Sequence, residues 1–154
     1  MSVSAEHEMT LKVLHNLGDV YSDQGKPDVA EVMYQQALDG FENTLSSNHT
    51  STLESVSSLG NSYLDQGKLR KAEEMYQRAL EGKQMALGTH HPSTLDIINN
   101  FGVLYYKQGM LDEAKAKFQQ AVEGFNSASL AGYPTSTRAA ENLRSLTIFM
   151  DNLQ

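Results

Sequence analysis

The sequence contains no cysteine, no tryptophan and only three prolines. Without cysteine, neither a disulfide framework nor a thiolate zinc site can form. No apolar run approaches the roughly 18 residues that a membrane span needs, and the first ten residues, MSVSAEHEMT, lack the basic and apolar pattern of a signal peptide. These absences predict a cytoplasmic protein that does not engage a membrane.

Positive charge is also scarce, because 12 lysines and arginines stand against 19 acidic residues and the formal net charge is -7. A protein that binds the phosphate backbone of nucleic acid concentrates lysine and arginine, so nucleic acid is not expected as a partner. Hydrophobic residues at 40% and charged residues at 20% are typical of a folded chain. A length of 154 residues predicts one domain.

What the chain does contain is a repeat. Residues 99–124, NNFGVLYYKQGMLDEAKAKFQQAVEG, recur 42 and 84 residues earlier with their apolar and small residues in register. A period between 20 and 50 residues is the signature of a solenoid, in which stacked units share a core. The matching slots are Leu17, Leu59 and Phe101; Gly18, Gly60 and Gly102; Tyr21, Tyr63 and Tyr105; Gly25, Gly67 and Gly109; Ala30, Ala72 and Ala114; Tyr34, Tyr76 and Phe118; Gly40, Gly82 and Gly124; and His7, His49 and His91.

Apolar residues at helical spacing predict a helix over 10–23 and, after a Gln-Gly-Lys-Pro turn, a second helix over 27–45. The next copies predict the same helix, turn and helix over 50–87 and 92–126, with serine and threonine as the helix caps. A seventh helix over 134–152 carries Arg144 in the glycine slot and Thr147 in the tyrosine slot. A helix that closes a stack packs on one side only, so this one is expected to be a cap.

The interior glycines need a reason, because glycine within a helix costs about 1 kcal/mol relative to alanine. We expect Gly18 to lie opposite Ala30 or Ala37, so that the two helix backbones approach closely, and Gly40 and its copies to do the same for the helix of the following repeat. At the C-terminal end, an excess of apolar residues predicts either further repeats or burial against a second copy. These residues are Leu146, Ile148, Phe149, Met150 and Leu153.

These slots resemble the tetratricopeptide repeat (TPR). The 42-residue period, with HPSTL at 91–95 and LGNSY at 59–63, is more specifically similar to the kinesin-light-chain type of that repeat. The resemblance covers about residues 7–154 and implies an all-α fold, a right-handed α-solenoid of three TPR helix pairs plus a C-terminal capping helix, seven helices in all. The single domain 1–154 then divides into repeats at about 7–48, 49–90 and 91–132 and a cap at about 134–152.

The resemblance also implies that a peptide or partner protein binds in a concave groove lined by the first helix of each repeat. Mid-helix asparagines on that face suit this role, since a carboxamide can both donate to and accept from a peptide backbone. Tyr106 is a candidate aromatic anchor at the groove edge. The candidate partner-binding residues are Lys12, His15, Asn16, Asp19, Ser57, Asn61, Asn99, Asn100, Tyr106, Arg138 and Asn142.

No catalytic, cofactor or metal site is predicted. Histidines at equivalent slots of successive repeats are separated by a helix layer, on the order of 10 Å, whereas zinc holds its ligand atoms within about 2.1 Å. We expect these histidines in loops and at helix starts. No arrangement of serine, histidine and acid stands out as a nucleophilic site, and no phosphate loop follows a strand, so an enzyme is not expected.

Three functional hypotheses remain open at this point. The first is a non-catalytic module that binds an extended peptide or a partner protein in the groove. The second is a scaffold that associates with its own copies through the C-terminal helix. The third, suggested by similar arrays in large receptors, is a sensor domain of a nucleotide-binding receptor.

Overall fold

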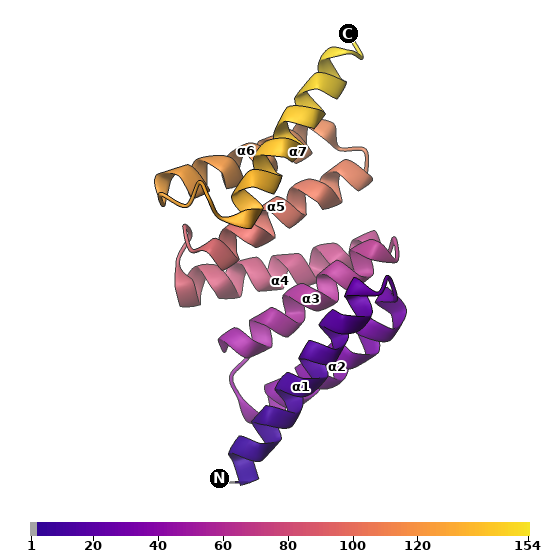
Figure 1. The fold of residues 1–154 in the computed structure, drawn as a ribbon, viewed down its shortest axis with the longest axis vertical. Helices are drawn as coiled ribbons and strands as arrows, with labels where there is room; N and C mark the ends of the chain where they lie inside the picture. Colours follow the sequence, from indigo (N-terminus) through magenta and orange to yellow (C-terminus); the bar gives the residue numbers. More distant parts are fainter. Residues whose placement is uncertain (1–2) are drawn as a thin grey trace. The chain divides into compact units, whose positions relative to one another are not determined.

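The computed structural model describes residues 3–154, and in these residues it contains seven α-helices (Figure 1). All seven were predicted, and most of their ends lie within a few residues of the predicted positions. The exception is the first helix, which begins at Val3 and not near Thr10, since no helix-breaking residue separates the two. The helices are α1 Val3–Asp23, α2 Pro27–Thr44, α3 Thr50–Asp65, α4 Leu69–Leu87, α5 Pro92–Lys107, α6 Leu111–Ser127 and α7 Pro134–Asp151.

The turn within each helix pair is built around a glycine in the left-handed region. Gly25, Gly67 and Gly109 have φ values of 70°, 72° and 79°. In the first pair, the amide of Gly25 donates to the carbonyl of Ser22 at 2.9 Å, and the next amide donates to Tyr21 at 2.9 Å. The prediction that glycine ends each first helix is therefore confirmed.

The caps of α3 and α5 differ from the prediction. They are made by histidines rather than by serine or threonine: Nδ1 of His49 accepts from the amide of Ser51 at 3.2 Å, and Nδ1 of His91 accepts from Ser93 at 3.1 Å. The nearby threonine hydroxyls bond instead to linker carbonyls, as Thr94 does to Gly88 at 2.8 Å. His49 and His91 thus mark helix starts, as expected, but the expectation is wrong for His7, which lies within α1 because that helix begins at Val3.

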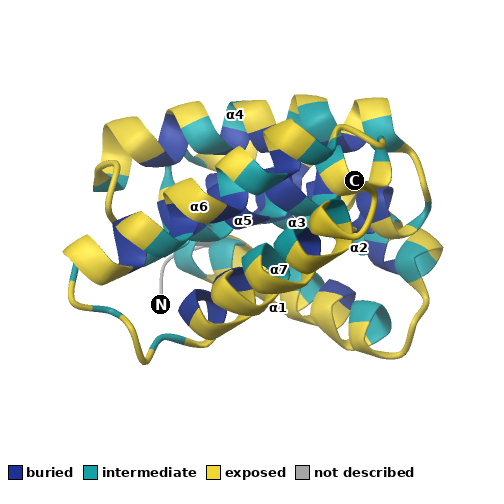
Figure 2. Ribbon diagram, turned by 90° about the horizontal axis from the view of Figure 1, so that it is seen from above, coloured by how far each residue is buried: buried dark blue, intermediate teal, exposed yellow. Residues whose placement is uncertain are grey.

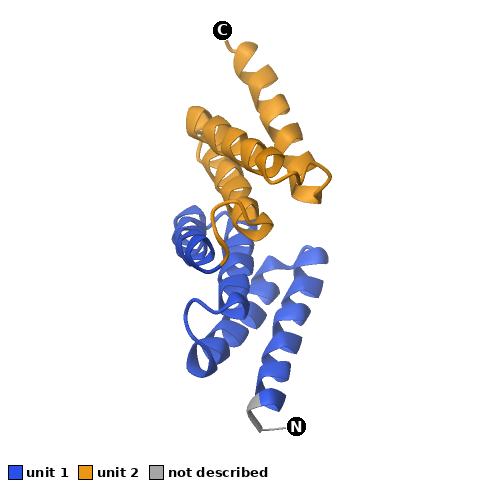
Figure 3. Cartoon of the chain, turned by 90° about the vertical axis from the view of Figure 1, so that its left-hand side faces the viewer, with its two compact units in different colours: residues 1–86 blue, residues 87–154 orange. Residues whose placement is uncertain are grey.

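The chain divides into two compact units, residues 1–86 and 87–154 (Figure 3). In the first unit, α2 packs against α1 and α3, and the two first helices α1 and α3 are neighbours. In the second unit, α6 packs against α5 and α7, and α5 and α7 are neighbours. Each unit therefore presents a face made of two adjacent helices. We call α1, α3, α5 and α7 first-position helices, because each stands where a repeat begins.

Buried and exposed residues alternate along the helices with the helical period (Figure 2), and α3 and α5 are buried over the largest part of their surface. The glycines of the first helices make room for aromatic rings of the paired second helix. An added Cβ would lie 2.5 to 2.8 Å from the nearest ring carbon, so the nearest neighbour is a ring and not the expected Ala30 or Ala37. The pairs are Gly18 with Tyr34, Gly60 with Tyr76, and Gly102 with Phe118.

The glycines of the second helices also act within their own pair, which corrects the expectation that they face the following repeat. A Cβ added to Gly40 would lie within 2.2 Å of a δ-carbon of Leu11, which belongs to the preceding helix of the same pair. The same contact recurs for Gly82 with Leu53 and for Gly124 with Leu95. Each pair is thus fastened by two reciprocal contacts of a glycine with a large side chain.

The two ends of the chain depart from the predicted burial. Leu17 is exposed, although its counterparts Leu59 and Phe101 are buried. At the other end, Leu146 is buried with Ala114 and Phe118, and Met150 packs on the same cluster. The apolar side chains that remain exposed on this last helix and just after it are Ile148, Phe149 and Leu153.

A polar cluster joins α2 to the turn after α3. Oε2 of Glu31 accepts from Nε2 of Gln66 at 2.7 Å and from Nζ of Lys68 at 2.8 Å. Burial acts to raise the pKa of Glu31, but the hydrogen bonds from Lys68 and Gln66 outweigh it and hold the pKa below its usual value.

We expect Glu31→Gln to lower the free energy of unfolding by roughly 0.5–1 kcal/mol at pH 7, because Lys68 is partly exposed and screened. A lowered folded pKa means that the stabilisation is present above the unfolded pKa of about 4.3 and is lost as the pH falls through the folded value. Urea denaturation at pH 7 and near pH 3 measures both. An equal difference between wild type and variant at the two pH values would contradict the role of the Glu31 charge.

Candidate functional site

On the first unit, the face of α1 and α3 carries a small polar cavity of about 200 Å³. Three of the predicted residues, Lys12, His15 and Asn16, line it together with Ser51, Glu54 and the edge of Phe41. Nδ1 of His15 lies 3.1 Å from Oγ of Ser55, which links α1 to α3. Nζ of Lys12 pairs with Glu8 at 2.8 Å.

One slot of this face is tied to the second helix by a tyrosine hydroxyl. Tyr34 donates to Oδ1 of Asp19 at 2.7 Å, and Tyr76 donates to Oδ1 of Asn61 at 2.6 Å. Burial, and then the bonded Asp19 carboxylate, raise the pKa of Tyr34, so its hydroxyl stays protonated and donates. In these two pairs, the groove-side residue is polar, and its Oδ1 atom already accepts a hydrogen bond from the tyrosine.

The third pair replaces both partners with apolar residues. Val103 stands in the slot of Asp19 and Asn61, and Phe118 stands in the slot of the two tyrosines. Phe118 is buried and Val103 is half-buried. The exchange removes a hydroxyl donor and its acceptor together, so no polar group is left unpaired by it.

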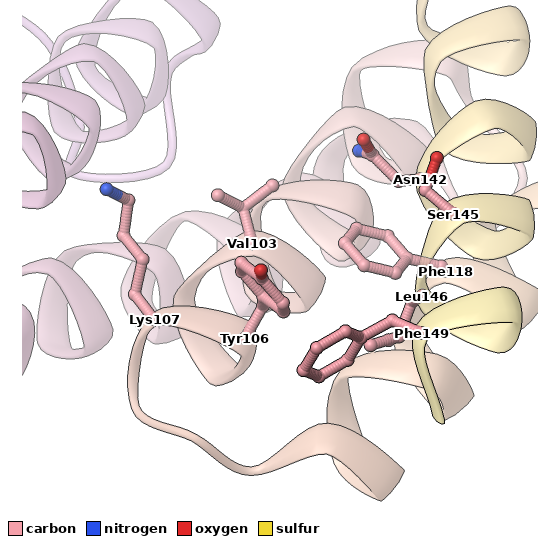
Figure 4. A pocket seen from close by; sticks show the side chains of 8 residues that line it. All are labelled: Val103, Tyr106, Lys107, Phe118, Asn142, Ser145, Leu146 and Phe149. Atoms are coloured by element: carbon pink, nitrogen blue, oxygen red, sulfur yellow. The ribbon is translucent and has the colours of Figure 1, made fainter. Parts of the chain in front are cut away.

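An open, mainly apolar pocket of about 440 Å³ lies at this point in the second unit (Figure 4). Side chains from α5, α6 and α7 converge on it, and Figure 4 shows the rings of Tyr106, Phe118 and Phe149 around the opening. Its volume falls in the range of about 300–1,000 Å³ usual for ligand pockets. It is lined by Val103, Tyr106, Lys107, Phe118, Asn142, Ser145, Leu146 and Phe149.

The electrostatics of the pocket are simple. Lys107 is its one charged lining residue, and no carboxylate lines it. Asn142 and Ser145 add polar atoms on the α7 side, while rings and aliphatic carbons form the rest. Such a surface suits an apolar side chain with hydrogen-bonding groups next to it.

The structure places most of the predicted residues on accessible surface of the two faces. Asn142 is half-buried and lines the pocket with Tyr106, which is exposed. Arg138 is exposed, and its Nη2 lies 3.4 Å from Oγ1 of Thr135. Exposed or half-buried are Lys12, His15, Asn16, Asp19, Asn61, Asn100, Tyr106, Arg138 and Asn142.

Two predicted residues are buried, which corrects their assignment as direct contacts. Asn99 is 1% exposed, and its Oδ1 accepts from Nδ2 of Asn142 at 3.4 Å. Ser57 is buried and donates to the carbonyl of Leu53 at 2.8 Å. Both belong to the slot that also holds His15; the bonds of His15 and Asn99 cross to the neighbouring first helix, whereas that of Ser57 stays within α3. This slot serves helix packing.

The list of candidates omitted several pocket residues. Val103, Phe118 and Phe149 are apolar, and sequence reasoning weighted polar side chains on the groove face. The sequence did contain a signal for Val103 and Phe118. Both slots are polar in the two earlier repeats, where they hold a hydrogen-bonded pair, and both become apolar together in the third repeat.

Two properties of residues 3–154 bear on function. No group of three or more histidine and carboxylate side chains among them is placed to hold a metal ion. None of the helices in this range has both the length and the apolar character needed to cross a membrane.

A family model of the tetratricopeptide repeat matches residues 2–43 and 49–127. The chain belongs to the tetratricopeptide repeat family. TPR domains are generally protein–protein interaction modules and are typically non-catalytic. The resemblance drawn from the glycine, alanine and aromatic slots is thereby confirmed, and the all-α solenoid of sequential helix pairs with it.

Solved structures show the same TPR fold. Two crystal structures of nearly identical TPR-like repeats from Podosopora anserina, one a point variant, come from a protein described as a candidate kinesin light chain. They are 24% identical to this chain with TM-scores of 0.78 and 0.79, and they cover 91% and 92% of it. BtubC (BKLC) from P. vanneervenii is 21% identical with a TM-score of 0.74, over 95% of the chain.

The chain spans 66%, 67% and 62% of the lengths of these three structures. At such identities the likeness shows the fold. No curated protein matches the chain.

Proposed function

We propose that this TPR chain binds an extended segment of a partner protein on the face made by α5 and α7, with an apolar side chain of that segment in the pocket. The observation that carries the proposal is the apolar exchange at Val103 and Phe118. Val103 and Phe118 form an apolar floor of the pocket in the second unit, whereas the equivalent residues of the first unit are joined by tyrosine hydrogen bonds.

The energetics favour an apolar anchor. Burying apolar surface contributes roughly 25 cal/mol per Å², so one large side chain filling the pocket supplies about 1.5–3 kcal/mol. Phe149 and Tyr106 are both about half exposed and gain burial when the pocket fills. Central aromatic residues of this kind usually dominate binding energy.

The polar atoms at the rim suit the backbone of the bound segment. The Asn142 carboxamide and the Ser145 hydroxyl lie beside the pocket and can exchange hydrogen bonds with peptide groups. One such bond is worth about 0.5–1.5 kcal/mol, less than the anchor. The anchor thus supplies affinity, and the rim sets the register of the segment.

The test begins with short peptides selected on the chain from a random library. We expect Phe149→Ala to weaken their binding about tenfold, equivalent to about 1.4 kcal/mol, measured by fluorescence anisotropy. Ile148→Ala is the matched control, because Ile148 is the adjacent residue, is 52% exposed against 46% for Phe149, and does not line the pocket. Equal loss in both variants, or in neither, would refute the pocket as the anchor site.

A second variant changes the floor while keeping the fold. Val103→Asn with Phe118→Tyr gives the third pair the residues that bond in the second pair, where the hydroxyl of Tyr76 reaches Asn61. The melting temperature is expected to stay close to wild type while selected peptides lose affinity. Retained affinity would show that the floor does not contribute.

Self-association is a second candidate, favoured by the exposure of Ile148, Phe149 and Leu153 on and just after α7. The same two alanine variants separate it from peptide binding. A dimer that buries this end as a surface loses stability with Ile148→Ala as well as with Phe149→Ala. Sedimentation at several concentrations measures this directly, and a strict monomer excludes the dimer.

A further inference from the structure

An uncovered apolar stripe runs along α1. Its members, which we call the α1 stripe, are Met9, Val13, Leu17 and Val20, with exposed fractions of 54%, 64%, 39% and 49%. Their spacing of four, four and three residues places them on one side of the helix. Four apolar side chains in a row are unlike the single exposed hydrophobics that any surface carries.

The equivalent slots of later first-position helices are covered. On α3 and α7 every one of them is buried or half-buried, and the second helix of the preceding pair packs there, α2 on α3 and α6 on α7. For α7 the contact is specific, since Leu146 and Leu143 pack with Ala114 and Phe118 of α6. The slots are Ser51, Ser55, Leu59 and Ser62 on α3, and Thr135, Ala139, Leu143 and Leu146 on α7.

The side chains of the α1 stripe are as apolar as those usually found in a buried interface. On α3 three of the four slots are serines, and yet two of those, Ser55 and Ser62, are fully buried. The exposed stripe on α1 is therefore more apolar than its buried counterpart. An apolar face left in water gains nothing, whereas a helix laid over it recovers the transfer free energy.

The charge beside the stripe defines what can cover it. Glu6 and Asp23 are each three residues from a member of the stripe and lie near its side of α1, whereas Glu8, Asp19 and the single lysine of α1 lie toward the other side. That lysine, Lys12, is already paired with Glu8. A covering helix with lysines and arginines beside its apolar side would gain from this field, and an acidic helix would be repelled.

We infer that the α1 stripe docks a basic amphipathic helix of a partner protein, laid on α1 in the way that α2 lies on α3. The interface repeats one that the fold already makes twice, so its geometry needs no rearrangement of the chain. A second copy of α1 is disfavoured as the occupant, because two helices with this excess of carboxylates would face each other.

The chain itself supplies both a probe and its charge control. A synthetic peptide of residues 69–87, the α4 sequence, has four basic and three acidic residues with apolar residues at helical spacing. A peptide of residues 27–44, the α2 sequence, is also an amphipathic second helix but has four acidic residues and no basic one. Both are labelled and titrated with the full chain by fluorescence anisotropy.

We expect saturable 1:1 binding of the 69–87 peptide, with weaker binding of the 27–44 peptide. Raising the salt from about 0.05 M to about 0.5 M should weaken binding of the basic peptide several-fold, because exposed charges are screened. Val13→Ser with Leu17→Ser in the chain should weaken it about tenfold without lowering the melting temperature, since both side chains are exposed. Val32→Ser is the matched control, because Val32 is as exposed as Val20 but lies on α2.

Several results would overturn the inference. Failure of the 69–87 peptide to saturate would mean that no helix of this type docks. Unchanged binding by the Val13 and Leu17 variant would mean that the peptide exchanges with α4 itself on α3. Stronger binding of the acidic peptide, or a dimer in sedimentation that the same variant abolishes, would assign the stripe to a different occupant.

Discussion

Gly102→Ala is expected to destabilise the second unit, although alanine is the better helix former. The new Cβ would lie 2.5 Å from both Cδ1 and Cε1 of Phe118 and 3.0 Å from Cζ. A flat ring packed between helices cannot yield on one edge without moving as a whole. Overpacking of this kind costs typically 1–3 kcal/mol, of which alanine returns about 1 kcal/mol through helix propensity.

The sharpest comparison is with Gly124→Ala in the paired helix. There the added Cβ meets the δ-carbon of Leu95 at 2.4 Å, which is shorter still, but the contact is the far end of a flexible side chain. Rotation of Leu95 relieves it, so the gain in propensity offsets most of the cost. Urea denaturation of both variants should therefore give a lower unfolding free energy for Gly102→Ala and a value close to wild type for Gly124→Ala.

A double-mutant cycle tests the cause. Phe118→Leu removes the ring, so adding Gly102→Ala to it should cost at least about 1 kcal/mol less than adding it to the wild type. Gly132→Ala is the neutral control, because nothing lies within 4 Å of its added Cβ. A cycle without coupling would mean that the ring is not what the glycine accommodates.

The sequence predicted the helices well because the repeat supplies the same information three times. In a single copy, a glycine can lie inside a helix or end it. The recurrence of glycine at positions 25, 67 and 109, between two apolar helical patterns each time, indicates a turn. The aromatic slots also indicated packing correctly. Their partners were not predictable, since spacing along a helix does not say whether Gly18 faces an alanine or the ring of Tyr34.

The candidate site was predicted less completely. A helical wheel places Asn99 on the groove face, but the wheel contains no neighbouring helix, and α7 provides the hydrogen-bond partner Asn142. The wheel also places Val103 on the groove face, but it gives no sign that this residue contributes to a binding site. Its role depends on Phe118, fifteen residues away on another helix, and only a comparison of the hydrogen-bonded pairs in the earlier repeats connects the two.

The exposed sides of α1 and α7 can be compared slot by slot. A first-position helix in this fold has a slot toward its own partner helix, a slot toward the preceding pair and a slot toward the groove. On α7 the partner-facing slots hold Thr137, Ala140, Arg144 and Thr147, which water can cover. On α1 the slots toward a preceding pair hold exposed apolar residues.

Asn99→Asp is expected to be the most damaging isosteric change in the second unit. The side chain is 1% exposed, and the substitution replaces an amide donor with a carboxylate beside Asn142. A buried carboxylate without a cationic partner costs roughly 3–5 kcal/mol if it stays ionised. Burial will raise the pKa of the introduced carboxyl, so the loss should be small below its unfolded pKa of about 3.9 and should grow as the pH rises above it.

Urea denaturation near pH 3.5 and at pH 7, each relative to wild type at the same pH, measures this growth. Asn61→Asp is the matched control, because Asn61 is exposed and the equivalent slot in the first repeat already holds Asp19, which accepts the Tyr34 hydroxyl at 2.7 Å. That variant should stay within about 0.5 kcal/mol of wild type. If the two variants were equally stable at pH 7, Asn99 would have to reach water, and its place among the groove contacts would be restored.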